Sequence, residues 1–79
     1  MEKSVAVVAI IISDVSAIES VNSILSSFRD YIIGRMGIPH HNGLNIISIA
    51  IEAPKETINS LSGKLGMQKG VTSKVLLAK

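Results

Sequence analysis

The sequence predicts an α+β domain in which a four-stranded antiparallel sheet carries two helices on one face. Three observations predict this class. Val5–Ile12 is an unbroken apolar run, which is typical of a central strand. Asn42-Gly43 stands between two apolar segments, and this dipeptide is the strongest short-range signal of a β-hairpin. On each side of the hairpin, apolar residues recur three and four positions apart, as in amphipathic helices.

Size and composition favour a single domain that associates with further copies. The chain has 79 residues, and we expect one domain over residues 1–79. A domain of this length buries only about 60% of the surface that its unfolded chain exposes, so its stability is marginal. The chain has no cysteine, which excludes disulfides and thiolate metal sites. We therefore expect a homo-oligomer, either a dimer or a tetramer.

Charge and apolar content also exclude several partners. The net charge of +2 is too small to indicate nucleic-acid binding, and the middle strands lack the aromatic residues of RNA-binding sheets. The first apolar run is shorter than the roughly 20 residues that cross a membrane. No small-residue cleavage site follows that run, as it would in a signal peptide. We expect a cytoplasmic protein without direct contact to nucleic acid or membrane.

The first helix is expected after Ser13-Asp14-Val15-Ser16, which ends the first strand. Ser16 and Glu19 fit a capping box, with Ser16 as the N-cap residue. Serine residues and Asn22 are expected to face solvent. The apolar stripe of this helix consists of Ile18, Val21, Ile24, Leu25 and Phe28.

The central hairpin runs from Tyr31 to Ile51, and its turn predicts a register. If Asn42-Gly43 forms a two-residue type I′ turn, His41 lies opposite Leu44. One face of the hairpin is then bulky and should meet the helices, with the pairs Ile38–Ile47, Met36–Ile49 and Gly34–Ile51. The other face is small and flat, with the pairs Pro39–Ile46, Gly37–Ser48 and Arg35–Ala50. A slip by one residue would exchange these faces.

The second helix is expected to begin near Pro54 and to pack through Ile58, Leu61 and Leu65. Gly66 is predicted as its C′ residue. Gly63 lies inside this helix at a cost of roughly 1 kcal/mol relative to alanine, which predicts that packing or a close approach to another segment requires the glycine. Val71–Leu77 is the last predicted strand, with Thr72, Lys74 and Leu76 on one side.

This order of elements, with right-handed crossovers, is the ferredoxin-like split βαβ arrangement. Its sheet places the first and third strands centrally and leaves Pro39, which cannot donate a ladder hydrogen bond, on an edge strand. The sheet face without helices would expose Ile46, Ala50, Leu76 and half of the first strand. Such an apolar face predicts homodimerisation through the sheet, face to face or edge to edge.

Polar residues of the hairpin are the candidates for chemistry. Arg35 could bind a carboxylate or phosphate through two hydrogen bonds, or it could lie over apolar surface or pair across a dimer. The same alternatives hold for Lys74, expected on the same face. His40 and His41 are adjacent and would point to opposite faces, so a metal site would need another chain. The carboxylates are scattered singly and no Ser-His-Asp arrangement is visible, so we expect neither catalysis nor a cofactor.

Three stretches resemble one known family. They are Arg35-x-Gly37-x-Pro39, the strand Leu44–Ile51, and Thr57-Ile58-x-x-Leu61-Ser62-Gly63-Lys64-Leu65-Gly66 followed by Gly70-Val71. Together they resemble the small regulators of the iron-only hydrogenase system, over nearly the whole chain. The resemblance implies an ACT-like, ferredoxin-like fold, similar in shape to the ligand-sensing domain of nickel-responsive regulators. It also implies an oligomer with a regulatory role in an anaerobe.

The resemblance supplies no ligand. Amino-acid-binding ACT domains have a glycine in the loop after the first strand, whereas this chain has none in Ser13–Ser16. Nickel sensors use several histidines and a cysteine, whereas this chain has two adjacent histidines and no cysteine. Neither ligand class carries over. Regulation of transcription would require a partner protein, because no DNA-binding segment is present.

Three hypotheses about function remain open. The first is an oligomeric ACT-like module that senses a small molecule or binds a protein partner. Its candidate binding residues are Arg35, Gly37, Pro39, Asn45, Gly63 and Lys64. The second is an accessory or scaffold protein for hydrogenase assembly, which would contact a protein of that system through the flat sheet face. The third is metal sensing through His40 or His41.

Overall fold

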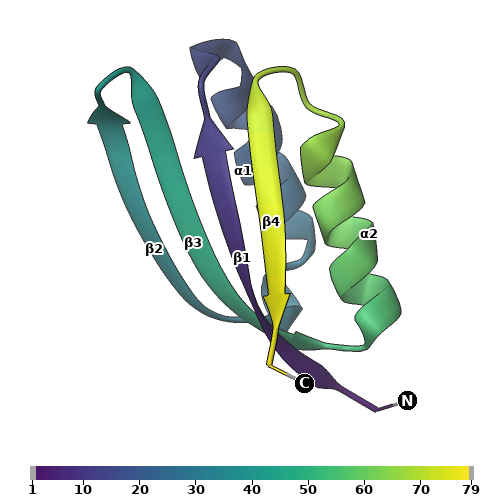
Figure 1. Ribbon diagram of the computed structural model, residues 1–79. Coiled ribbons are helices and arrows are strands. Elements are labelled where there is room, and N and C mark those ends of the chain that lie inside the picture. Colours follow the sequence, from purple (N-terminus) through teal and green to yellow (C-terminus); the bar gives the residue numbers. More distant parts are fainter. Residues whose placement is uncertain (1, 79) are drawn as a thin grey trace.

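One sheet and two helices form the fold, in the order that the sequence predicts (Figure 1). The computed structural model describes residues 2–78. Its elements are β1 (Ser4–Ile12), η1 (Val15–Ala17), α1 (Ile18–Ser27), η2 (Arg29–Tyr31), β2 (Ile32–His41), β3 (Leu44–Ala53), α2 (Lys55–Gly66) and β4 (Val71–Leu77). The strands are antiparallel in the order β2-β3-β1-β4. The predicted ferredoxin-like arrangement, with β1 and β3 central and β2 at an edge, is confirmed.

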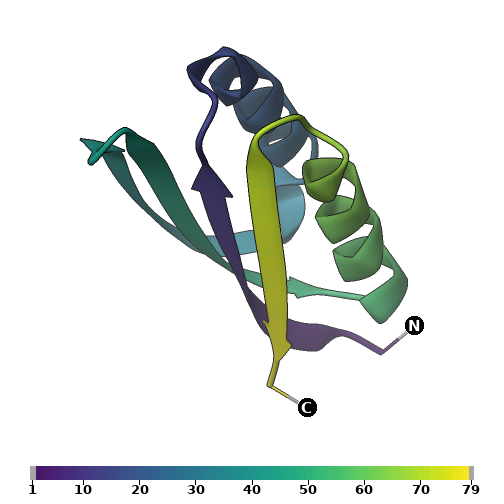
Figure 2. The same cartoon turned by 45° about the horizontal axis from the view of Figure 1, so that its top comes forward.

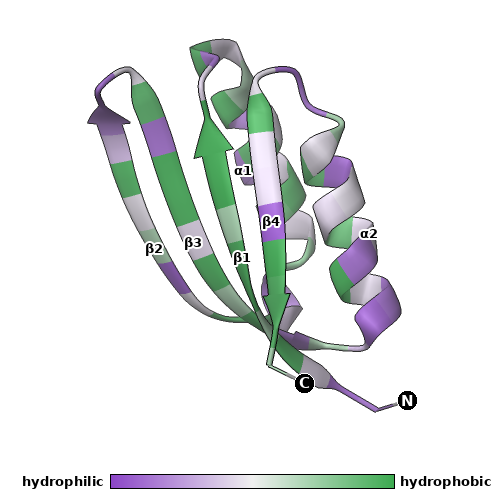
Figure 3. Ribbon diagram, in the orientation of Figure 1, coloured by the Kyte–Doolittle hydropathy of each residue, from purple (hydrophilic) through white to green (hydrophobic). Residues whose placement is uncertain are grey.

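Both helices cover the same face of the sheet, and the opposite face carries no helix (Figures 1 and 2). Along β1, the residues Ala6, Val8, Ile10 and Ile12 are buried and the residues between them are exposed. Figure 3 shows that β1 is hydrophobic along nearly its whole length. The uninterrupted apolar run therefore supplies one buried row and one apolar row that the single chain leaves uncovered.

The core forms between the helices and the covered face of the sheet. α1 buries Val21 and Leu25, and α2 buries Ile58, Leu61 and Leu65, as their spacing predicts. Complete burial of one such side chain contributes about 1.5–3 kcal/mol to stability. The strands contribute Ala6, Val8, Ile10, Ile12, Ile47, Ile49, Ile51 and Ala53 to the same cluster. None of the helices in the described part of the chain is long and apolar enough to cross a membrane.

The predicted N-cap at Ser16 is wrong. α1 begins at Ile18 after the short turn η1, and its N-cap residue Ala17 makes no side-chain capping bond. Asp14 caps η1 instead: its Oδ1 accepts hydrogen bonds from the Ser16 backbone N–H at 3.0 Å and from the Ser16 hydroxyl at 2.7 Å. Hydrogen bonds to an ionised acceptor are about twice as strong as neutral ones, which explains why the aspartate provides the cap.

This cap predicts a pH dependence of stability. The Ser16 hydroxyl, and then the Ser16 backbone N–H, lower the pKa of the Asp14 carboxyl from its ordinary value of 3.8. A carboxyl whose pKa is lower in the folded chain stabilises the fold above its unfolded pKa. It loses this contribution as the pH falls through the folded pKa. We expect wild type to exceed Asp14→Asn in free energy of unfolding at pH 7, and the difference to shrink below pH 3.8. Urea unfolding of both proteins, from pH 7 to below pH 3.8, measures this difference in free energy of unfolding. A difference that does not change with pH would contradict the prediction.

The same end of the molecule is closed by a contact between two loops. The carbonyl oxygen of Gly70, just before β4, accepts hydrogen bonds from the Ser13 backbone N–H at 2.8 Å and the Ser13 hydroxyl at 3.1 Å. Gly70 has a φ of +75° and faces Asp14 so closely that a Cβ would lie 2.5 Å from the Asp14 Cβ. This contact joins the loop after β1 to the loop after α2.

The hairpin turn is confirmed, but the predicted register holds only next to it. Asn42 and Gly43 have φ values of 54° and 77°, as a type I′ turn requires, and His41 pairs with Leu44. Farther along, Ile38 pairs with Ile46 instead of Ile47, and Arg35 pairs with Ile49 instead of Ala50. The strands have slipped by one residue relative to the prediction.

A β-bulge at Pro39-His40 causes this slip. Two residues of β2 lie opposite Asn45 alone, and His40 adopts a left-handed φ of 54°. The His40 backbone N–H donates a hydrogen bond to the Asn45 side-chain Oδ1 at 3.1 Å, so a side chain satisfies a donor that leaves the ladder. The two predicted faces of β2 are therefore exchanged. Arg35 and Gly37 lie on the helix side, whereas Gly34, Met36 and Ile38 lie on the open side.

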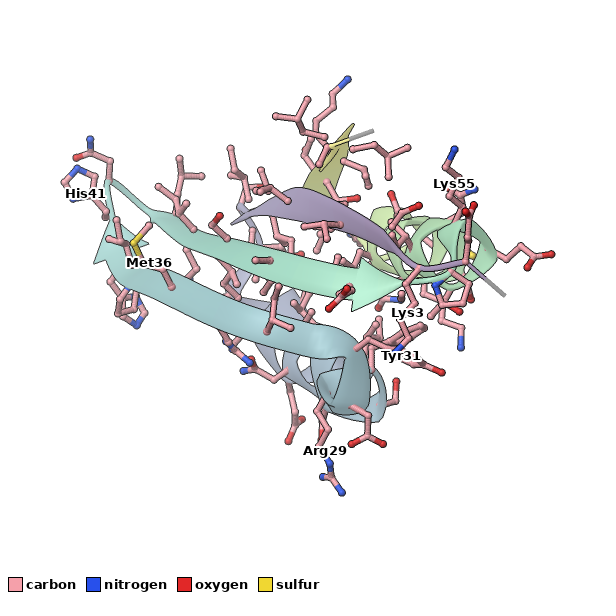
Figure 4. All side chains as sticks on the ribbon, turned by 90° about the horizontal axis from the view of Figure 1, so that it is seen from below. Lys3, Arg29, Tyr31, Met36, His41 and Lys55 are labelled. Carbon is pink, nitrogen blue, oxygen red and sulfur yellow. The ribbon has the colours of Figure 1, made fainter. Side chains whose placement is uncertain are left out.

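The open side of the sheet is a broad apolar surface, which we call the outer face. Figure 4 shows Met36 on β2, projecting away from the helices. A second irregularity at Ile33 returns Ile32 to the covered side, where it packs against the core. Lys74 and Glu52 are the charged residues of the outer face, on β4 and near one end of β3. Its apolar residues are Val5, Val7, Ala9, Ile11, Met36, Ile38, Ile46, Ala50 and Leu76.

Candidate functional site

A groove lies between α1 and the β2–β3 hairpin, where the hairpin curves away from the helices (Figure 2). Its volume is about 250 Å³. The lining residues are Ile12, Ile18, Asn22, Arg35, Gly37, Ile38, Pro39, Asn45, Ile46 and Ile47. Four of the six predicted binding residues, namely Arg35, Gly37, Pro39 and Asn45, therefore line one cavity.

Arg35 spans the groove. From β2 its guanidinium Nη2 donates a hydrogen bond of 2.8 Å to the side-chain Oδ1 of Asn22 on α1. The bulge makes this contact possible, because the predicted register would place Arg35 on the outer face. The expectation that Arg35 and Lys74 share a face is wrong for the same reason, since Lys74 lies beside Ala9 on the outer face.

Apolar side chains form most of the remaining lining. Ile12, at the end of β1, and Ile47 on β3 are buried and belong to the core. Gly37 is opposite Ile47, on the covered side of the sheet, and its lack of a side chain leaves room above the strand. A Cβ added there would meet nothing closer than the Ile46 carbonyl oxygen at 3.9 Å, so the backbone tolerates a side chain.

Gly63 and Lys64 do not belong to this groove. They lie on α2, and the Lys64 Nζ is 5.4 Å from the centre of the Phe28 ring, at the end of α1. A cation at this position over an aromatic face is attracted to it, which gives Lys64 a role in joining the two helices. The expected close approach at Gly63 is wrong, because a Cβ there would meet no atom within 4 Å. Gly66, predicted as the C′ residue, is the last residue of α2.

The two histidines stay at the exposed end of the hairpin, with His41 beside the turn (Figure 4). Within residues 2–78 the structure contains no group of three or more His, Cys, Asp or Glu side chains that could hold a metal ion. The polar group that the backbone of His40 contacts is the Asn45 amide oxygen. The hydrogen bond at the hairpin tip is therefore one that stabilises the β-bulge.

Asn22 is the polar lining residue that the sequence pattern missed. Its polar character predicts only an exposed position on α1, and it is indeed exposed. It lies four residues after Ile18, however, so both side chains come from the same side of the helix, at the border of the apolar stripe. This spacing is only a weak signal that Asn22 belongs to a binding site. It becomes informative once Arg35 is known to face α1.

Comparison with known proteins identifies relatives of the whole chain. Residues 4–75 match the TM1266-like family, described as "Iron-only hydrogenase system regulator, putative". Among solved structures, the uncharacterized protein TM1266 from Thermotoga maritima has a TM-score of 0.93 and 32% sequence identity. The match covers 99% of this chain and 100% of that one. No curated protein matches the sequence.

A second solved structure shares only the fold. It is a formyltetrahydrofolate deformylase from Pseudomonas putida KT2440, with a TM-score of 0.58 and 14% identity. The similarity covers 92% of this chain but only 28% of the enzyme. At this identity it supports the ferredoxin-like architecture and carries no activity over to this chain.

Proposed function

Because this chain belongs to the TM1266-like family of iron-only hydrogenase system regulators, we propose that it is a regulatory module that acts by binding. A small-molecule effector occupies the groove between α1 and the hairpin. A second copy of the chain covers the outer face of the sheet. The module performs no catalysis of its own.

The observation that carries the effector role is the convergence of polar groups on an apolar groove. Arg35, Asn22 and Asn45 come from three different elements and line one cavity with isoleucine side chains. Binding sites for small molecules are typically apolar hollows with a few polar groups that set orientation. The hairpin and α1 contact each other across this groove through Arg35 and Asn22, so an occupant would affect how the two elements are held together.

The size of the outer face supports a second copy as its partner. Four strands about 4.8 Å apart and a nine-residue β1 with a rise of about 3.3 Å per residue give a face of roughly 20 by 30 Å. Its area is comparable to the roughly 800 Å² that each partner buries in an ordinary stable complex. A second copy would also give this small domain the apolar burial that one chain cannot provide.

The groove can be filled by substitution at Gly37. Gly37→Val places a β-branched side chain in a strand at a position without steric conflict, so we expect the free energy of unfolding to rise by about 0.5–1 kcal/mol. Binding of an effector in the groove should be lost at the same time. Gly34→Val is the matched control, because Gly34 pairs with Ala50 on the outer face. Equal retention of effector by both variants would contradict a site in the groove.

Native mass spectrometry of protein purified from anaerobically grown cells, without added ligand, tests the proposed function as a whole. We expect a mass of two or more chains, together with a small molecule that Gly37→Val fails to retain. A monomer would contradict the role of the outer face. A ligand-free oligomer that no metabolite fraction from the same cells stabilises in thermal unfolding would contradict the effector role.

The exposed apolar outer face also favours a second candidate function, that of an accessory protein in hydrogenase assembly. In that case the face docks on a hydrogenase or maturation protein instead of a second copy. Capture from hydrogenase-expressing cells with wild type and with Val7→Lys, a change at the centre of this face, separates the two functions. A monomeric wild type that captures such a protein, while the variant does not, would favour the accessory role.

A further inference from the structure

We propose that the groove binds a small organic anion, which carries one carboxylate or phosphate group on a short apolar body. This inference rests on the effector role proposed for the groove and gives the effector a chemical class. The hydrogen bonds that the lining residues already make are the reason for it.

Among the described residues, the two asparagines of the groove use their amide oxygens to accept a hydrogen bond and leave their NH₂ groups available as donors. The Asn22 Oδ1 accepts from Arg35, and the Asn45 Oδ1 accepts from the His40 backbone N–H. A guanidinium and a backbone N–H can only donate, so the orientation of both amides is fixed. Each amide therefore has its NH₂ group left to offer. Arg35 adds further N–H groups, because a guanidinium has five.

The charge of the lining residues also favours an anionic ligand. Arg35 is its one ionised side chain, and the lining includes no aspartate or glutamate. The described hydrogen-bond partner of Arg35 is a neutral amide, so this contact does not neutralise the guanidinium. A carboxylate or phosphate accepts two parallel hydrogen bonds from arginine, which adds geometric selectivity to the attraction of opposite charges.

The size and the apolar lining of the groove indicate what the rest of the ligand is like. A volume of about 250 Å³ lies near the lower end of the roughly 300–1,000 Å³ that is typical of ligand pockets, so the groove suits a small compound. Its apolar side chains on the helix side, Ile12, Ile18 and Ile47, suit a short branched or unbranched hydrocarbon body.

Three probes of nearly equal shape test the inference in the full-length protein. Isovalerate carries a carboxylate, isobutyl phosphate carries a phosphate, and isovaleramide is the neutral analogue of the first. Titration of ¹⁵N-labelled protein with each probe is followed through the amide signals of Gly37 and Ile47 and the side-chain signals of Asn22. We expect saturable shifts with at least one anionic probe, and at least roughly tenfold weaker binding of the neutral one. The tighter of the two anions shows which headgroup the groove selects.

Substitutions assign the binding to Arg35. Arg35→Gln should weaken binding of the anion at least roughly tenfold. Arg29→Gln is the control: it removes the same charge from an exposed position on η2 and should leave the affinity for the anion unchanged. Figure 4 shows Arg29 projecting away from the sheet. Asn22→Asp should also abolish binding, because it places a carboxylate against Arg35. Asn59→Asp on α2 is its control.

The outcomes separate this inference from the proposed function. Binding of isovaleramide as tight as that of isovalerate, or equal losses in Arg35→Gln and Arg29→Gln, would overturn the anion site and leave the groove as an effector site. The absence of shifts at the groove with all three probes would count against both.

Discussion

Gly70→Ala is expected to lower the free energy of unfolding by about 2–4 kcal/mol, a large part of the roughly 5–15 kcal/mol that stabilises a small domain. Gly70 has a φ of +75°, a conformation that costs an L-residue about 1–2 kcal/mol. The new Cβ would also lie 2.5 Å from the Cβ and 3.1 Å from the backbone nitrogen of Asp14. Because the crowded atoms belong to the backbone and its first side-chain atom, a rotamer change cannot relieve them.

The relief must come from movement of the loop, which breaks the two hydrogen bonds from Ser13 to the Gly70 carbonyl oxygen. Urea unfolding followed by far-UV circular dichroism measures the effect. Gly63→Ala is the control: its Cβ enters open space in a helix, so we expect stability to rise by about 0.5–1 kcal/mol. Equal effects at the two glycines would show that the Asp14 contact is absent in solution.

Val7→Lys is expected to dissociate the proposed oligomer, with a dissociation constant roughly 100-fold higher or more. Val7 lies at the centre of the outer face, between Ala50 and Leu76 on the neighbouring strands. Its side chain is 44% exposed in the single chain, so lysine can project there without entering the core. In a face-to-face dimer the same ammonium would be buried without a partner, which costs several kcal/mol.

Sedimentation equilibrium and native mass measurement of both proteins report this change, and circular dichroism checks that the variant is folded. Asn59→Lys adds the same charge to the exposed side of α2 and should leave the subunit number unchanged. A Val7→Lys variant that keeps the wild-type mass would exclude the outer face as the interface between copies. Dissociation of both variants would point to net charge as the cause.

The element order, the core and the hairpin turn were predictable because their signals are local. The 3–4 spacing of Val21, Leu25 and Phe28 needs no knowledge of distant segments, and the positive φ values of Asn42 and Gly43 follow from their residue types. The central strands β1 and β3 were predictable for the same reason, since each is a largely apolar run bounded by turn residues. Such predictions tolerate small errors at the ends of elements.

The bulge was not predictable in this way, because it depends on one hydrogen bond between the two strands. Nothing in the local pattern of Pro39-His40 shows that the Asn45 side chain will accept from the His40 backbone N–H. The candidate residues were nevertheless identified largely correctly as a group, since Arg35, Gly37, Pro39 and Asn45 line one groove. Their position relative to the helices was inverted, and Asn22 was missed because its importance comes only from that position.

The bulge also couples the length of the hairpin to the chemistry of one side chain. A hairpin shorter by one residue between Ile38 and Asn42 would present the same faces of β2 without a bulge, and would have no need of an acceptor at the position of Asn45. A hairpin of the present length needs that acceptor, or its faces exchange. Among related sequences, loss of the asparagine should therefore accompany a deletion in the hairpin, and an alignment that spreads the gap elsewhere would equate residues from opposite sides of the sheet.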